Sequence, residues 1–228
     1  MHRWLVVLLF ASCIIDCDDD SLPRDPPCLG APCCNVPGCY YDFDLALWSK
    51  SEVQELHLVF PWSGVARRSG FSDSLLLFPN LTDLSIRQVE LDTIPWGVYR
   101  VRRLRHLSLE DMIRPTFLST EIRQLDSLEV LCIVSTRISS LPPEIGELRR
   151  LRYLFLDNNE LSVLPPEIGA LTVLDSVRLS YNVLTTLPES VRNWTKLRHL
   201  DLRHNPIDTT QRAKIRSWLP QATILFDD

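Results

Sequence analysis

Residues 151–173 read LRYLFLDNNELSVLPPEIGALTV, a segment in which leucine or isoleucine recurs at fixed intervals on either side of Asn159. The same spacing returns 23 residues later, from Leu174, and 23 residues earlier, from Leu128. Further copies begin near Val53, Leu81, Leu104 and Leu197. A repeat of 20 to 50 residues indicates a solenoid in which each copy is one structural unit.

The repeat resembles the leucine-rich repeat family, in its 23-residue L-x-x-L-x-L-x-x-N-x-L-x-x-L-P-x-x-I-x-x-L-x-x class. That resemblance implies an α/β solenoid: a curved array with a concave parallel β-sheet, short convex helices or 3₁₀ turns, and a C-terminal capping helix. The residues agree with it, because Leu154 and Leu156 alternate with outward residues as in a strand. The pair Pro165-Pro166 is suited to starting a short helix or 3₁₀ turn.

The asparagine of each copy is expected to bond backbone groups where the chain leaves the strand, as the resemblance implies. Three copies supply it, through Asn159, Asn182 and Asn205. Other residue types occupy the same position earlier in the chain, namely Val89, Met112 and Thr136. We therefore expect the earlier copies to be less regular and less stable than the last three.

The boundaries of the repeat divide the chain into four segments, with the leucine-rich repeats over residues 51–206. Residues 207–228 break the period and are predicted to form a C-terminal cap, with an amphipathic helix over Gln211 to Leu219. The side chains spaced to cover the last coil are Ile215, Trp218, Leu219 and Ile224. Residues 1–12 are predicted as a signal peptide, and 13–50 as a Cys- and Pro-rich tether or N-terminal cap.

An apolar run of twelve residues, Trp4 to Ile15, follows Arg3 near the start of the chain. It is too short for a membrane span, which needs about 20 residues, but suits a signal peptide. The stretch from Leu9 to Cys13 resembles the bacterial lipobox, which implies lipidation of Cys13, although Phe10 departs from the usual aliphatic residue. The sequence leaves open secretion without lipid, or a buried N-terminal helix in a cytoplasmic protein.

Six of the seven cysteines fall within the first 39 residues, as is typical of a chain in an oxidising compartment. We expect disulfide bonds that staple this segment, with the pairing undetermined. The candidates besides Cys13 are Cys17, Cys28, Cys33, Cys34 and Cys39. A zinc site is the alternative, but the adjacent Cys33-Cys34 fits thiolate ligand spacing poorly; unpaired cysteines in a tether are a third. No metal is expected.

Composition excludes several classes of partner. Lys plus Arg number 24 and Asp plus Glu 29, so a net charge of −5 argues against nucleic acid. Only seven glycines are present, and no glycine-rich phosphate motif occurs, so we expect no nucleotide or other cofactor. The predicted partner is a protein, with the membrane reached only through the lipid, and the chain is expected to be a monomer.

Charged residues occupy the second position of successive copies with alternating sign. Neighbouring parallel strands lie about 4.8 Å apart, so these side chains are predicted to form a surface ladder of ion pairs rather than a binding site. The ladder comprises Arg105, Glu129, Arg152, Asp175 and Arg198.

An enzyme would need a nucleophile, and the isolated thiol Cys132 is a candidate with His106 on the preceding strand. No third group or oxyanion hole is identifiable, so we expect a surface or cap-linked cysteine and no catalysis. Outward residues of the predicted sheet form the better candidate, because exposed apolar and aromatic residues rimmed by charge are typical of protein interfaces. The predicted partner-binding residues are Val130, Val134, Tyr153, Phe155, Asp157, Arg178 and Tyr181.

The function predicted is a non-enzymatic protein–protein interaction module that is exported and either anchored by lipid at the cell envelope or secreted. The alternative is an intracellular, cytoplasmic scaffold that regulates a small GTPase or kinase pathway, as the resemblance to plant and animal signalling repeats implies. The signal-like segment and the clustered cysteines favour the first.

Overall fold

The computed structural model describes residues 39–40, 53–59, 73–88, 93–112 and 117–227. These residues form a nine-stranded sheet in chain order, with every pair of neighbours parallel. The strands are β1 (Cys39–Tyr40), β2 (Glu55–Val59), β3 (Asp83–Arg87), β4 (His106–Glu110), β5 (Val130–Val134), β6 (Tyr153–Phe155), β7 (Ser176–Arg178), β8 (His199–Asp201) and β9 (Thr223–Leu225).

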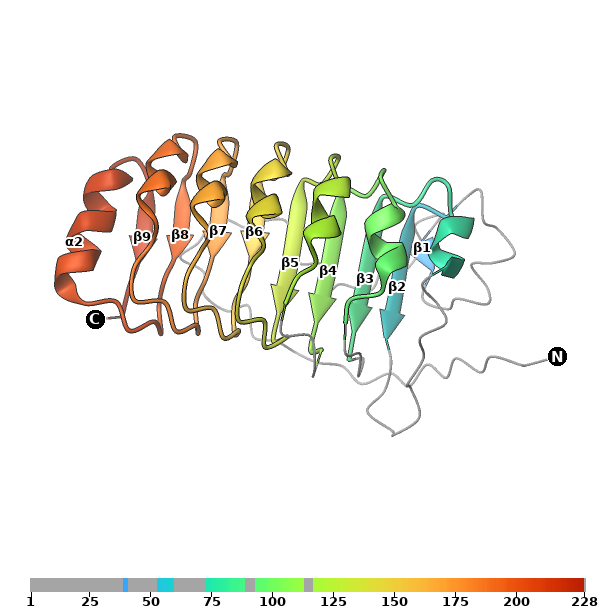
Figure 1. The fold of residues 1–228 in the computed structure, drawn as a ribbon, viewed down its shortest axis with the longest axis horizontal. Coiled ribbons are helices and arrows are strands. Elements are labelled where there is room, and N and C mark those ends of the chain that lie inside the picture. Colours follow the sequence, from blue (N-terminus) through green and yellow to red (C-terminus); the bar gives the residue numbers. More distant parts are fainter. Residues whose placement is uncertain (1–38, 41–52, 60–72, 89–92, 113–116, 228) are drawn as a thin grey trace.

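One short helix follows most strands and returns the chain to the start of the next (Figure 1). All but the last of the described helices are 3₁₀ helices of five residues, and the last is the α-helix α2 (Thr209–Trp218). The 3₁₀ helices are η2 (Asp73–Leu77), η3 (Trp96–Arg100), η4 (Thr120–Gln124), η5 (Pro143–Glu147), η6 (Pro166–Ala170) and η7 (Glu189–Asn193).

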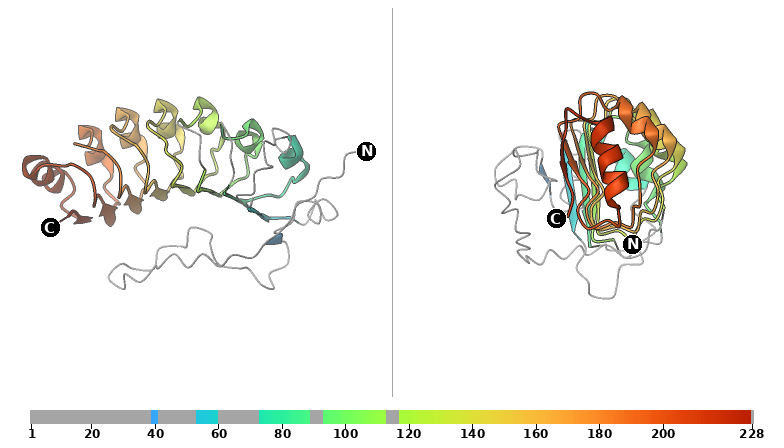
Figure 2. Two further views of the ribbon diagram at one scale, coloured as in Figure 1. Left: turned by 90° about the horizontal axis from the view of Figure 1, so that it is seen from below. Right: turned by 90° about the vertical axis from the view of Figure 1, so that its left-hand side faces the viewer.

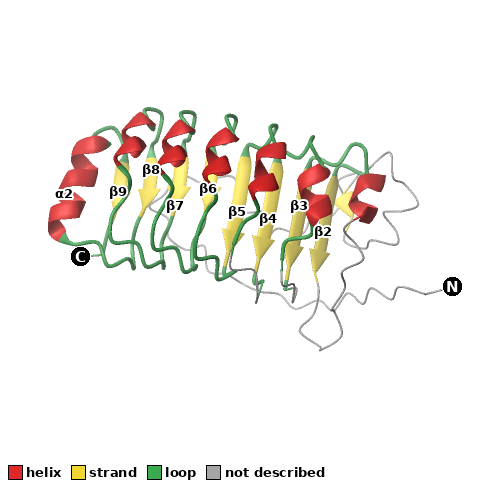
Figure 3. Cartoon of the chain, in the orientation of Figure 1, coloured by secondary structure: helices red, strands yellow, loops and turns green. Residues whose placement is uncertain are grey.

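The helices all lie on one side of the sheet, and the two layers enclose one continuous apolar core (Figure 3). The sheet lines the inner side of a curve and the helices fan out on its outer side (Figure 2). Leu154 of β6 pairs in register with Leu131 of β5 and Val177 of β7, and all three are fully buried. The expected concave parallel sheet and convex 3₁₀ turns are confirmed.

Proline starts two of the 3₁₀ helices, because its fixed φ suits the first helical position and its missing N–H has no partner there. Pro165 precedes η6 and Pro166 opens it, as the sequence predicted. Gly169 in the same helix allows the next coil to approach closely: a Cβ there would lie 2.4 Å from the carbonyl oxygen of Ser190.

The C-terminal segment folds as the amphipathic pattern predicted, with α2 covering residues 209–218 rather than 211–219. The carboxylate of Asp208 caps the helix by accepting a hydrogen bond from the backbone N–H of Gln211 at 2.7 Å. Three of the four predicted cap residues, Ile215, Trp218 and Leu219, are buried in the main core, and Ile224 packs against it.

Two features were not predicted. Cys39–Tyr40 pairs with β2 as an additional strand, inside the segment interpreted as a tether or cap. The early strands β2–β5 have five residues each, whereas β6–β8 have three, so strand pairing is more extensive in the copies expected to be less regular. The predicted signal peptide and Cys13, Cys17, Cys28, Cys33 and Cys34 lie outside the described residues.

Candidate functional site

The concave face is built from the side chains that point away from the helices, and strand register arranges them in rows. One row crosses the sheet from His57 through Ser85 and Ser108 to Cys132, and continues through Phe155 to Arg178 and Asp201. Each residue in such a row contacts its counterparts on the two neighbouring strands. The face is thus polar over β2–β4, apolar over β5 and β6, and charged over β7 and β8.

The apolar middle of this face forms a second, smaller cluster, separate from the main core. Val130, Cys132 and Phe155 are buried in it, and Val134 and Tyr153 pack against them partly buried. The expectation that Val130 and Phe155 are exposed is therefore wrong: Phe155 is only 1% exposed. Adjacent strands bring these apolar side chains together, and burying them against one another is favourable.

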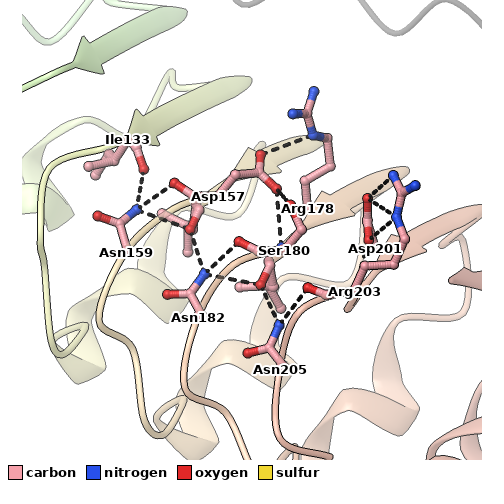
Figure 4. Close-up of polar contacts among 11 residues, drawn as sticks. Ile133, Asp157, Asn159, Arg178, Ser180, Asn182, Asp201, Arg203 and Asn205 are labelled. Carbon is pink, nitrogen blue, oxygen red and sulfur yellow. Dashed lines mark hydrogen bonds and ion pairs between the residues drawn. The ribbon is translucent and has the colours of Figure 1, made fainter. Parts of the chain in front are cut away.

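Phe155 is further enclosed by its polar neighbour. The guanidinium of Arg178 lies over its ring, 5.3 Å from the centroid, and the ring of Tyr153 lies 6.3 Å away. Arg178 also forms an ion pair with Asp157, with Nε and Oδ2 3.0 Å apart. Arg178 thus links the apolar cluster to the charged part of the face, as Figure 4 shows for its contact with Asp157.

Asp157 was expected to be exposed but is buried beneath Arg178. Its Oδ1 accepts hydrogen bonds from the backbone N–H of Ser180, at 3.1 Å, and from the Ser180 hydroxyl, at 2.7 Å. Burial raises the pKa of Asp157, and Arg178 together with the Ser180 bonds opposes that shift. On the next coil, Arg203 donates to both carboxylate oxygens of Asp201 (Figure 4).

The polar part over β3 and β4 is held by two further ion pairs, between His106 and Asp83 and between Arg87 and Glu110. The hydrogen bond with Asp83 raises the pKa of His106, against the effect of burial. Burial alone would raise the pKa of Asp83, but the hydrogen bonds from His106 and Thr82 outweigh it and lower that pKa. The positive and negative charges on this part of the face are therefore matched within it.

Three asparagines lock the turns at the ends of the later strands (Figure 4). Asn182 donates to the backbone oxygen of Leu156 on the preceding coil, and its Oδ1 accepts from the N–H of Leu161. Asn159 and Asn205 repeat both bonds with the coils before them. The predicted asparagine role is present, and it joins each coil to its predecessor.

A left-handed backbone conformation occurs shortly after each of the strands β3 to β8, at the residue before the asparagine position, which the sequence did not predict. The residues with positive φ in this turn are Gln88, Asp111, Ser135, Asn158, Tyr181 and His204. Tyr181 is the least suited to it, since tyrosine rarely adopts positive φ. It is 57% exposed, and its ring stacks on that of His204 with centroids 4.0 Å apart.

The candidate nucleophile is not a surface residue. Cys132 is 1% exposed, within the apolar cluster, so the expected surface position is wrong. Strand register pairs His106 with Val130 and Ser108 with Cys132, which places His106 diagonal to the thiol. Nδ1 of His106 interacts with Asp83 on the opposite neighbouring strand.

Three of the four ion pairs of the predicted ladder are recorded at the amino ends of the strands. Arg105 lies 4.0 Å from Glu129, and Asp175 receives both Arg152, at 3.2 Å, and Arg198, at 3.4 Å. Because the arginines are largely exposed, each pair contributes about 0 to 1 kcal/mol. Among the described residues, no group of acidic, histidine or cysteine side chains is arranged to hold a metal ion, and no helix has the length and apolar character of a membrane span.

Comparison with known proteins supports the leucine-rich repeat family. Residues 149–207 match the family described as Leucine rich repeat. A solved leucine-rich repeat protein of Leptospira interrogans superposes with a TM-score of 0.68 and 31% sequence identity, over 77% of this chain. This chain spans 49% of that protein's length. A search of curated protein sequences found no match.

The fold is therefore a leucine-rich repeat solenoid, an open all-parallel sheet with 3₁₀ turns between its strands. Solenoids of this kind are commonly protein-interaction modules and typically not enzymes.

Proposed function

We propose that this protein is an exported, lipid-anchored module that binds a partner protein on its concave face. The twelve-residue apolar run before Asp16 and the lipobox-like Leu9 to Cys13 support export and lipidation. The clustered N-terminal cysteines support an oxidising compartment. A lipid on Cys13 leaves the solenoid itself available to a protein partner.

The conformation and exposure of Tyr181 are the main support for the position of the binding site. The left-handed conformation recurs at this position of the coils from β3 to β8, and it is least favourable for a bulky residue such as Tyr181, where it costs roughly 1 to 2 kcal/mol. Here the strained residue is an exposed aromatic, the side-chain class most enriched in binding hot spots. Its ring stacks on His204 of the next coil, and its backbone N–H donates to the carbonyl oxygen of Arg203 at 3.0 Å.

The binding site is tested by crosslinking in the cell. A photoreactive phenylalanine analogue at position 181 of the full-length chain is expected to give one discrete crosslinked product. The same analogue at Trp96, which is 49% exposed on η3 in the convex layer, is the control and is expected to give none. Tyr181→Asn should lose the partner without unfolding. Equal crosslinking at both positions would contradict a concave site.

Export is tested separately, by intact mass and membrane fractionation of the full-length chain in a bacterium, wild type beside Cys13→Ser. The expected wild type lacks residues 1–12, carries acyl mass and sediments with membrane, whereas the variant does not. A chain that keeps Met1 and stays in the cytosol would overturn export and favour the intracellular scaffold.

A further inference from the structure

The edge of the solenoid where each 3₁₀ helix passes into the next strand, at the top in Figure 1, is strongly basic. The positions concerned are the last two residues of a coil and the second residue of the next. From Arg102 onwards they hold three carboxylates, Asp126, Glu129 and Asp175, against eight cations. This excess of positive charge lies on a chain whose net charge is −5.

A hollow of about 750 Å³ opens along this edge, over the coils that contain Glu129, Asp175 and Lys196. Its two carboxylates already have cationic partners. Asp175 receives Arg152 and Arg198, and Glu129 receives Arg105 from the preceding coil. Four of the five ladder residues, Glu129, Arg152, Asp175 and Arg198, therefore line the hollow.

Three cations that line the hollow, Arg149, Arg150 and Lys196, have no carboxylate partner in the part of the chain that the structure describes. All three are exposed. Arg149 donates one hydrogen bond, to the carbonyl oxygen of Ala170 at 2.9 Å, which leaves most of its guanidinium donors available. The hollow therefore carries positive charge that nothing within the described chain neutralises.

We propose that this hollow binds an acidic segment of a partner protein, at a site separate from the concave face. Side-chain carboxylates of such a segment would pair with Arg149, Arg150 and Lys196. A carboxylate has about four acceptor positions, so Asp175 and Glu129 still have positions for a peptide's backbone N–H groups. Val173 gives the hollow an apolar patch.

The two carboxylates in the lining argue against phosphate as the ligand. A phosphate group offers oxygen acceptors and negative charge, so the carboxylates of Asp175 and Glu129 would repel it. An acidic peptide carries both side-chain carboxylates and backbone N–H donors, so it can pair with the cations and with the carboxylates of the lining. The recessed shape also suits a chain segment better than the surface of a bilayer.

The test uses the full-length protein and a fluorescein-labelled peptide of alternating Glu and Ala, about eight residues long, which extends to about 26 Å. Fluorescence anisotropy measures its affinity. Reversing the three unpaired cations, with Arg149→Glu, Arg150→Glu and Lys196→Glu, is expected to weaken binding by about tenfold or more. The matched control, Arg102→Glu, Arg103→Glu and Arg123→Glu, changes exposed residues outside the hollow by the same charge and should weaken it by less than about threefold.

Equal losses in the two triple variants would overturn the proposal, because they would show attraction to the general field of the edge. So would absence of peptide binding by the wild type, or binding only to phosphatidylglycerol vesicles. Tyr181→Asn should leave the affinity for the peptide unchanged, so the two proposed sites are tested independently. Circular dichroism of every variant establishes that the fold is retained.

Discussion

Replacing Asn182 by Ala tests how the coils are joined. The Asn182 side chain accepts from the Leu161 N–H at 3.0 Å and donates to the backbone oxygens of Leu156, Leu179 and Ser180, at 2.9, 3.0 and 3.2 Å. These groups are shielded from water, so each bond that is lost has to be replaced within the protein or left unmade.

The neighbouring coils limit the number of hydrogen-bonding groups that lose every partner in this variant. The Leu156 oxygen still receives Asn159, the Leu179 oxygen still receives Asn205, and the Ser180 oxygen still receives a backbone N–H. Only the Leu161 N–H loses its acceptor. One orphaned buried donor costs about 1 to 3 kcal/mol, and three weakened carbonyl contacts add about 1 kcal/mol more, so the variant should lose about 2 to 4 kcal/mol.

Thr136→Val is the matched control, because Thr136 occupies the same position of an earlier coil. Its hydroxyl donates to Asn159 Oδ1 at 2.9 Å, but that oxygen keeps the backbone donors of Thr136 and Ile138, both at 3.2 Å. No group is orphaned, and the expected cost is below about 1 kcal/mol.

Urea unfolding of the full-length chain compares the two variants, followed by far-UV circular dichroism and by tryptophan fluorescence. Trp194 is buried in the core and bonds to the Ile168 carbonyl oxygen at 3.0 Å, so it reports on the C-terminal coils. Costs for Asn182→Ala and Thr136→Val that agree within about 0.5 kcal/mol, at equal m-values, would refute the reasoning.

Four further substitutions test single features of the fold. Gly169→Ala brings a Cβ within 2.4 Å of a carbonyl oxygen on the next coil, and urea midpoints should show a loss of about 1 to 3 kcal/mol. Asp208→Ala removes the cap of α2 and should cost about 1 kcal/mol by the same assay. Tyr181→Asn should be more stable than Tyr181→Ala by about 0.5 to 1 kcal/mol, because both lose the ring but asparagine tolerates positive φ; equal stability would contradict strain there. His106→Gln should reduce stability most between about pH 4 and 6.5. The raised pKa of His106 gives stability that is lost as pH rises above 6.5, and the lowered pKa of Asp83 gives stability that is lost as pH falls below 3.8. A stability difference from wild type that is independent of pH would count against this pairing.

The strand positions, the 3₁₀ turns and the C-terminal helix were predictable because each is encoded by a local pattern. Leu154 and Leu156 point inward whatever their neighbours are, and the pair Pro165-Pro166 starts the 3₁₀ helix η6. The ladder of charges was also predictable, since a fixed period of 23 residues determines which side chains lie side by side. These inferences need only the period and the geometry of a strand.

The burial of side chains on the concave face could not be predicted in the same way. An outward position on a strand does not determine exposure, since Phe155 is enclosed by Arg178, Tyr153 and the cluster around Cys132. Whether an outward side chain is buried depends on the size and reach of several neighbours together. The positive φ at Tyr181 was missed for a different reason, because the residue types at that position share no common signal.

The asparagine bonds and the inward leucines hold the coils in register without using the outward rows or the edge. Those positions can therefore differ from coil to coil at little cost in stability, and it is there that the coils do differ: charge pairs over β3 and β4, an apolar cluster over β5 and β6, unpaired cations at Arg149 and Lys196. Substitutions at inward positions should change mainly stability, and those at exposed outward and edge positions should change mainly binding. Tyr181 is the exception, since its backbone conformation opposes stability while its exposed ring favours contact. A residue with that combination is the first place to look for the partner.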